Sequence, residues 1–160
     1  MTQPTLNFLV AHPAHFIALG FGSGLAPKAP GTFGTLAALP LYWLLLQAGL
    51  GLPALLAVIA AGFVLGIWAC AVTGSNLGVS DHGGIVWDEI IAMWLVLSFT
   101  PAGWLWWLAA FGLFRFFDIL KPWPIRFFDT RLKSGFGVMF DDLLAALYAL
   151  LLIKGWQWLA

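Results

Sequence analysis

The chain has 160 residues, of which 62% are hydrophobic and only 9% are charged, and its mean hydropathy is +0.95. This composition lies far above the apolar share of a soluble domain, so we expect a single integral membrane domain over residues 1–160. Seven Lys and Arg balance seven Asp and Glu, which gives no electrostatic reason to expect a nucleic-acid partner. One Cys excludes an internal disulfide, and the first twenty residues lack the Lys or Arg of a cleaved signal peptide.

Residues 1–20 are mildly apolar and are interrupted by Pro4 and Pro13. His12 and His15 lie in this segment, but Pro13 separates them and no third metal ligand is near. We therefore expect two solvated histidines in an interfacial segment rather than a metal site.

A glycine-rich loop with the sequence FGSGLAPKAPGTFGT follows at residues 21–35. Glycines let backbone N–H groups turn toward an anion, and the N-terminus of a following helix adds a favourable dipole. The spacing is not that of a Walker A loop, and a flexible entry loop explains the composition equally well. If the loop binds phosphate, the groups we expect to contribute are Ser23, Lys28, Gly31 and Thr32.

Four apolar stretches complete the predicted architecture. Residues 35–50 and 52–72 are each near the length that crosses a hydrocarbon core of about 30 Å, and the Gly/Pro break between them predicts a helical hairpin. Residues 90–114 contain the breaker Thr100-Pro101-Ala102-Gly103, so we predict a broken, re-entrant hairpin there rather than one span. Residues 143–160 form the last span. The predicted fold class is all-α, a polytopic membrane helical bundle.

These hairpins would place the loops at residues 21–35, 73–89 and 115–142 on one face of the membrane. Six of the seven Lys and Arg lie in these loops, and the positive-inside rule makes that face cytoplasmic. We therefore expect a multi-pass protein of a cytoplasmic membrane, surrounded by membrane lipids, with its functional loops toward the cytoplasm.

All seven acids lie between residues 81 and 142. Ionisable groups beside a bilayer are costly and persist where they pair with each other, with ions or with substrate. Mg²⁺ prefers oxygen ligands and commonly binds carboxylates together with substrate phosphate. We expect the metal at Asp88, Asp118, Asp141 and Asp142. The alternative, a set of solvated salt bridges beside the membrane, does not explain why the acids avoid both termini.

The cations of the same region predict a phosphate site. Arg115 and Asp118 are three residues apart and would share a helix face, and Lys121 precedes the Pro122 that must end this helix. We expect substrate phosphate to bind Arg115, Lys121 and Arg126. The expected catalytic set is Asp88, Glu89, Asp118, Asp129 and Lys121. No nucleophile motif is present, so metal-activated water is the simplest attacker, with His82 as a candidate general acid.

Four motifs carry a resemblance to a known family: GSGLAPKAPGTFGT at 22–35, DHGGIVWDE at 81–89, FRFFDILKPWPIRFFD at 114–129 and GFGVMFDD at 135–142. In this order they resemble phosphatidylglycerophosphatase A, a bacterial membrane lipid phosphatase. The resemblance implies an Mg²⁺-dependent hydrolase of the bacterial inner membrane that converts phosphatidylglycerophosphate to phosphatidylglycerol and inorganic phosphate. The alternative is a small ion or proton transporter, although its acids would be expected near the midplane of the spans.

Overall fold

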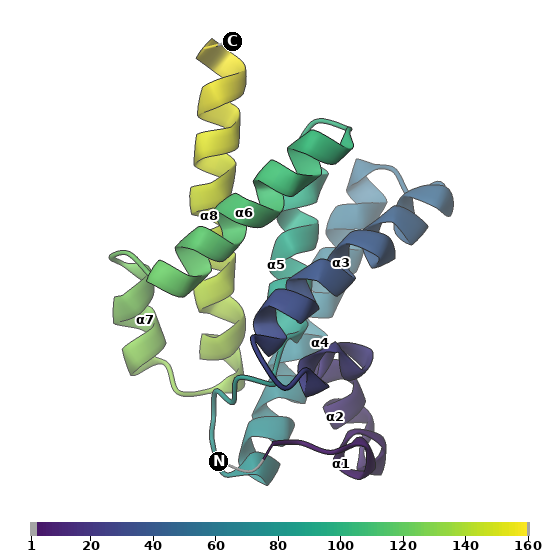
Figure 1. The fold of residues 1–160 in the computed structure, drawn as a ribbon, viewed down its shortest axis with the longest axis vertical. Helices are drawn as coiled ribbons and strands as arrows, with labels where there is room; N and C mark the ends of the chain where they lie inside the picture. Colours follow the sequence, from purple (N-terminus) through teal and green to yellow (C-terminus); the bar gives the residue numbers. More distant parts are fainter. Residues whose placement is uncertain (1–2, 160) are drawn as a thin grey trace.

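The computed structural model describes residues 3–159, and every regular element within them is a helix (Figure 1). This confirms the predicted all-α class. In chain order the helices are α1 (Leu6–Ala11), α2 (Pro13–Ala18), the 3₁₀ helix η1 (Gly20–Leu25), α3 (Pro30–Gln47), α4 (Leu52–Leu77), α5 (Trp87–Ser98), α6 (Trp104–Leu120), α7 (Ile125–Arg131) and α8 (Gly135–Leu159).

Helix α5 lies at the centre of the bundle and packs against α3, α4, α6 and α8. Ten of its twelve residues are buried, which is the pattern of a helix surrounded by protein on all sides. Two indoles fix it to its neighbours. Trp87 Nε1 donates to the carbonyl oxygen of Gly62 on α4 at 2.9 Å, and Trp94 Nε1 donates to that of Ala38 on α3 at 3.0 Å.

The predicted break within residues 90–114 is confirmed. Helix α5 ends at Ser98, and α6 begins after Gly103, whose φ of 130° is open to glycine but strained for other residues. The two helices fold back on each other, and Arg115 near the end of α6 reaches Glu89 at the start of α5. At 1.5 Å per residue, α5 extends only about 18 Å, so this hairpin is short.

Glycines at helix contacts determine how closely α8 approaches α4 and α5. A Cβ on Gly66 of α4 would meet Met139 of α8 and Trp87 of α5. A Cβ on Gly135 would collide with the backbone carbonyl oxygen of Ile67 on α4. The backbones of α4 and α8 therefore touch where α8 begins, and the second turn of α8 lies inside the bundle.

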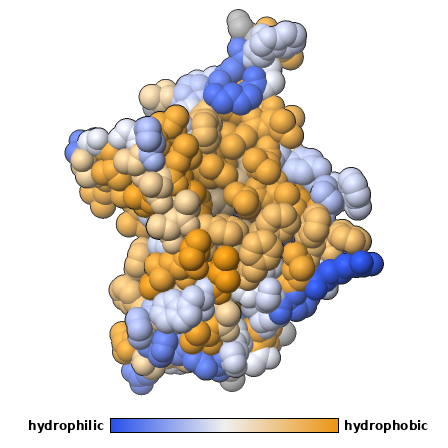
Figure 2. Space-filling model, turned by 180° about the vertical axis from the view of Figure 1, so that it is seen from behind, coloured by the Kyte–Doolittle hydropathy of each residue, from blue (hydrophilic) through white to orange (hydrophobic). Residues whose placement is uncertain are grey.

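Two of the described helices, α4 and α8, are long and apolar enough to cross a membrane, which suggests membrane association. The predicted span at residues 35–50 corresponds to α3, which begins earlier at Pro30, contains Pro40, and is not one of these two. Figure 2 shows a broad band of hydrophobic surface across one face of the molecule, with hydrophilic surface beside the C-terminus, at one side and at the opposite end.

The N-terminal helices dock onto α4 through a buried histidine, contrary to the expectation that both histidines are solvated. His15 is only 4% exposed. Its Nδ1 lies 2.8 Å from the carbonyl oxygen of Phe8 and its Nε2 lies 2.8 Å from the side-chain nitrogen of Asn76, so a neutral ring that donates from Nδ1 satisfies both. His12 instead caps α2, accepting from the amide of Ala14.

The contact of α8 with α4 gives a test of this packing. Gly135→Ala should lower the melting temperature in detergent, because the new methyl group meets a backbone carbonyl that cannot rotate away; such overpacking commonly costs about 1–3 kcal/mol. Gly155→Ala on the same helix is the matched control, since a Cβ there has no atom within 4 Å. Equal melting temperatures for the two variants would contradict the close approach.

Candidate active site

Five carboxylates are buried where α5, α6 and α8 meet. They come from the first turn of α5, the last turn of α6 and the second turn of α8: Asp88, Glu89, Asp118, Asp141 and Asp142. The α5–α6 hairpin joins the first two helix ends, and α8 packs against both helices. The structure thus gathers five of the six acids that the sequence analysis selected, and the sixth, Asp129, joins them through Lys121.

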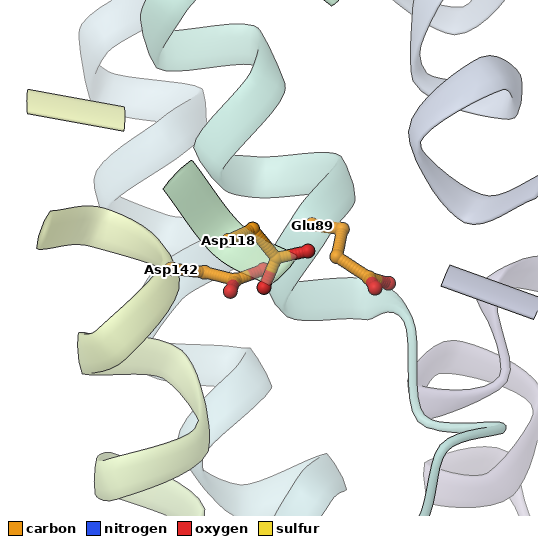
Figure 3. Close-up of side chains that lie close together, drawn as sticks. All are labelled: Glu89, Asp118 and Asp142. Carbon is orange, nitrogen blue, oxygen red and sulfur yellow. The ribbon is translucent and has the colours of Figure 1, made fainter. Parts of the chain in front are cut away.

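Three of these carboxylates converge on one point. Each of Glu89, Asp118 and Asp142 has a carboxylate oxygen within 4.8 Å of one on each of the other two. Figure 3 shows the carboxylates of Asp118 and Asp142 beside each other and that of Glu89 to one side of them. This set shares Asp118 and Asp142 with the predicted metal ligands and adds Glu89, which the sequence analysis placed in the catalytic set. Asp88 and Asp141, the other two predicted ligands, lie in the same buried group. The sequence could not decide among them, since the phase of α5 relative to α8 depends on tertiary packing.

Several buried polar atoms of this cluster have no hydrogen-bond partner among the described residues. They are Asp88 Oδ1, Glu89 Oε2, Asp142 Oδ2 and Arg115 Nε. A buried carboxylate oxygen without a partner is costly, and such atoms persist where something else completes the site. Three of the four are acceptors on carboxylates, so the missing partner is a cation or a strong donor.

Arg115 connects two of the converging carboxylates. Its Nη1 lies 3.1 Å from Glu89 Oε1 and 2.5 Å from Asp118 Oδ2, so the guanidinium links the start of α5 to the end of α6. The predicted pairing of Arg115 with Asp118 at three-residue spacing is confirmed. The fork of a guanidinium also matches two oxygens of a phosphate, so this residue can hold an anion beside the carboxylates.

Lys121 forms the second ion-pair centre. Its Nζ donates to Asp129 Oδ1 of α7 at 2.9 Å and to Asp141 Oδ2 of α8. Lys121 caps α6 in the left-handed conformation with φ of 43°, a strained geometry for a residue with a side chain. The prediction that the helix ends before Pro122 is confirmed, and the structure directs the ammonium of Lys121 into the acidic region.

The charges of this second centre reinforce each other. Burial acts to lower the pKa of Lys121, but the negative charge of Asp141 and the hydrogen bonds to Asp141 and Asp129 raise it well above its ordinary value. Burial acts to raise the pKa of Asp129, but the hydrogen bond and charge of Lys121 hold it below its ordinary value. Lys121 and Asp129 are therefore an ionised pair near neutral pH.

The glycine-rich loop packs tightly against the start of α5. A Cβ on Gly31 would collide with Glu89 Oε1, and a Cβ on Gly34 would meet Val86 and approach Glu89 Oε2. A Cβ on Gly24 would likewise collide with the carbonyl oxygen of Gly84. Besides any role in binding an anion, these glycines therefore let the first turn of α3 approach Glu89 and fix its position.

The other residues predicted to bind phosphate lie outside this packing. Ser23 donates its hydroxyl to the carbonyl oxygen of Gly20 at 2.8 Å. Thr32 is half-buried in the first turn of α3, next to Gly31. Lys28 and Arg126 are exposed and form no ion pair with the described residues. Among the described residues, none of these four forms a hydrogen bond or ion pair with the five buried carboxylates.

The loop before α5 contains Asp81, which lies beside the acidic site, and His82, which lies in a different hollow. Asp81 lines a narrow hollow together with Asp129, Lys133 and Asp141, so it extends the acidic region. The sequence analysis did not select it, although its place in the same acidic stretch was a usable signal. His82 accepts from the amide of Gly84 at 3.0 Å and lines a different hollow beside Pro4.

The fold and the site define an all-helical protein with two membrane-length helices and a buried cluster of carboxylates paired with Arg and Lys. Comparison with known proteins identifies the group: the family model described as phosphatidylglycerophosphatase A matches residues 16–157, and the chain belongs to this family. The chain is accordingly a phosphatase, as the sequence resemblance indicated.

Two relatives illustrate the similarity. Phosphatidylglycerophosphatase A of Haemophilus influenzae is 49% identical over 157 residues, covering 98% of this chain and 96% of that protein. Phosphatidylglycerophosphatase A of Escherichia coli is 43% identical over 152 residues, covering 93% of this chain and 87% of that protein. No solved structure matches the chain.

The packing of Gly31 against Glu89 gives a test of the site. Gly31→Ala should lower the rate of phosphate release from phosphatidylglycerophosphate by about 10- to 100-fold, because displacing a site residue by even 1 Å can cost that much. The control is Gly83→Ala in the loop before α5, where a Cβ meets no atom within 4 Å. An unchanged rate in Gly31→Ala would mean that the position of Glu89 does not matter for turnover.

Proposed function

We propose that this protein is a Mg²⁺-dependent lipid phosphatase that removes the terminal phosphate of phosphatidylglycerophosphate and leaves phosphatidylglycerol and inorganic phosphate. Membership of the phosphatidylglycerophosphatase A family supports the substrate. The single observation that carries the chemistry is the convergence of Glu89, Asp118 and Asp142 beside the cation Arg115. Such a cluster offers oxygen ligands to a metal and a positive charge to a phosphate.

The donor set fits Mg²⁺. All three converging groups are carboxylates, the hard oxygen ligands that Mg²⁺ prefers, and two of them keep an unpaired buried oxygen, Glu89 Oε2 and Asp142 Oδ2. Asp88 and Asp141 lie in the same buried group and are further candidates for direct or water-mediated contact. A bound Mg²⁺ would polarise the phosphate and lower the pKa of a water beside it.

The residues of the chain supply the remaining functions on this proposal. Arg115 and Lys121 bind and orient the terminal phosphate, with Ser23, Lys28, Gly31, Thr32 and Arg126 as further contacts toward the headgroup. The unpaired Oδ1 of Asp88 accepts a proton from the attacking water. A bond forms between the water oxygen and the phosphorus as the bond to the glycerol oxygen breaks, and that oxygen takes a proton from solvent.

The transporter alternative is not favoured by the position of the acids. The five buried carboxylates lie in the terminal turns of α5 and α6 and near the start of α8 rather than midway along the helices. A transport site would be expected near the midplane, where broken helices meet. A site at helix ends instead suits a substrate whose phosphates lie at headgroup depth.

The proposed arrangement in the membrane follows from the same helix ends. On this proposal α3, α4 and α8 cross the inner membrane of a bacterium, the α5–α6 hairpin is re-entrant, and the acidic site faces the cytoplasm. Six of the seven Lys and Arg lie in the loops and helix ends around that site, which supports this orientation. Non-helical backbone within the bilayer is tolerated when protein surrounds it, as at the buried residues 84–86 that precede α5.

Metal dependence is the first test of this function. Phosphate release should stop in EDTA and return with Mg²⁺, because the carboxylates then lack the cation that completes them. Asp142→Asn should raise the Mg²⁺ concentration for half-maximal activity by about tenfold or more, since an amide keeps the shape but removes the charge of a ligand. Asp81→Asn, outside the converging triad, is the comparison. Full activity in chelator would refute the metal.

Membrane orientation can be tested with single cysteines in a Cys70→Ala background. Gly83→Cys and Trp123→Cys, both exposed, should react with an impermeant maleimide only after the inner membrane is opened. Gln47→Cys, exposed at the other end of α3, should react in intact spheroplasts. The reason is that α3 and α4 connect at the end of the molecule away from the acids. Labelling of positions 83 and 123 from opposite sides would overturn the proposed arrangement.

A further inference from the structure

An apolar groove lies between α6 and α8, away from the carboxylates. Its volume is about 560 Å³, and its walls include Trp106, Ala109, Leu113, Leu152, Gly155 and Trp156. None of the described residues that line it is charged. In Figure 1 the two helices cross near the middle of α8 and separate toward its C-terminus.

The groove belongs to the same two helices that carry the acidic site. Leu113 precedes Asp118 by five residues on α6, or about 7.5 Å along the helix axis, and Leu151 follows Asp142 by nine residues on α8, or about 13.5 Å. Because α6 ends and α8 begins near the carboxylates, both distances run in the same direction. The groove therefore extends away from the acids along the bundle.

Two aromatic side chains connect the groove to the acidic site. Phe117 is four residues after Leu113 and Tyr148 is three residues before Leu151, so each continues the groove-facing side of its helix. Their rings pack together with centroids 5.2 Å apart, and the Tyr148 hydroxyl donates to the carbonyl oxygen of Trp123 at 3.0 Å. Apolar surface thus continues from the groove to the turn that holds Lys121.

We propose that this groove holds an acyl chain of the lipid substrate and so aligns its headgroup with the carboxylates; the inference rests on the proposed function. An acyl chain reaches about 15 Å into the membrane, half of a hydrocarbon core of about 30 Å. Along α6 the groove runs from about 7.5 Å (Leu113) to about 18 Å (Trp106) from Asp118, so this wall overlaps the depth of such a chain. Along α8 the groove begins about 13.5 Å from Asp142, so only the end of the chain reaches that wall. Its apolar lining and its place beside the site suit this occupant.

The groove acts by alignment rather than by attraction. Lipid tails are as apolar as the lining, so moving a chain from the bilayer into the groove gives little hydrophobic gain. Packing against two fixed helices instead restricts the positions of the attached phosphates, which favours the reactive geometry. Filling the groove should therefore reduce kcat/KM for long-chain lipids and leave the chemistry at the carboxylates intact.

The test compares two phenylalanine variants and two substrates. Gly155→Phe places a ring in the groove without displacing backbone, because a Cβ there has no atom within 4 Å. The matched control is Gly112→Phe on α6, which is exposed, equally free of neighbours and outside the groove. The substrates are phosphatidylglycerophosphate with two palmitoyl chains and with two hexanoyl chains, assayed in the same detergent.

Gly155→Phe should lower kcat/KM for the palmitoyl substrate by about tenfold, because a misplacement of the reacting groups by about 1 Å commonly costs that much or more. The hexanoyl substrate should change by less than about twofold, and Gly112→Phe should leave both substrates within that range. Ala109→Phe, which fills the groove from α6, should reproduce the selective loss. Agreement between the two groove variants would show that the space, and not one helix position, determines the preference.

If Gly155→Phe lost kcat/KM equally for both substrates, or for neither, the proposed role of the groove would be overturned. A change of oligomeric state in Gly155→Phe, measured by light scattering and accompanied by equal losses of kcat/KM for both substrates, would also overturn the groove. The groove would then be a contact with a second copy of the chain. Failure of the wild-type protein to hydrolyse either substrate would contradict the proposed function and the groove with it. Hydrolysis of both by the wild type, with unchanged preference in Gly155→Phe, would contradict the groove alone.

Discussion

Burial of five carboxylates at the junction of three helices is the constraint on which the rest of the structure depends. Charges removed from water must be compensated by partners, and two cations, Arg115 and Lys121, contact this group. Arg115 joins α5 to α6, and Lys121 joins α7 to α8. The contacts that compensate the buried charge therefore also determine how the helix ends meet, and they leave carboxylate oxygens free for a cation.

The backbone meets this constraint by close approach. Gly31 and Gly34 let the first turn of α3 lie against Glu89, and Gly135 lets α8 begin against the backbone of α4. Side chains at these positions would move Glu89 or Asp142 away from the common point. The apolar residues of α5 serve the same end, because a helix buried on all sides holds its first turn, and the two acids in it, in one orientation.

Local chemistry made part of this structure predictable from the sequence. The Thr100–Gly103 breaker predicted the α5–α6 hairpin, and the confinement of the acids to one region predicted that they gather. Helix phase and depth were not predictable, because they depend on contacts between distant segments. For this reason the converging triad includes Glu89, which was not among the expected metal ligands, and His15 is buried against Asn76 where solvent was expected.

The two ends of a lipid pose different problems, and α6 and α8 address both. A phosphate can be located by charge, because Arg115 and Lys121 act over short distances at the buried end of these helices. A tail cannot be located by affinity, because the bilayer is as apolar as any groove. The tail can therefore be positioned only by the shape of the groove. That shape positions the phosphate only if the groove is rigidly connected to the charged site. Since Asp118 and Asp142 sit on the same two helices as Leu113 and Gly155, that connection is the helix backbone itself.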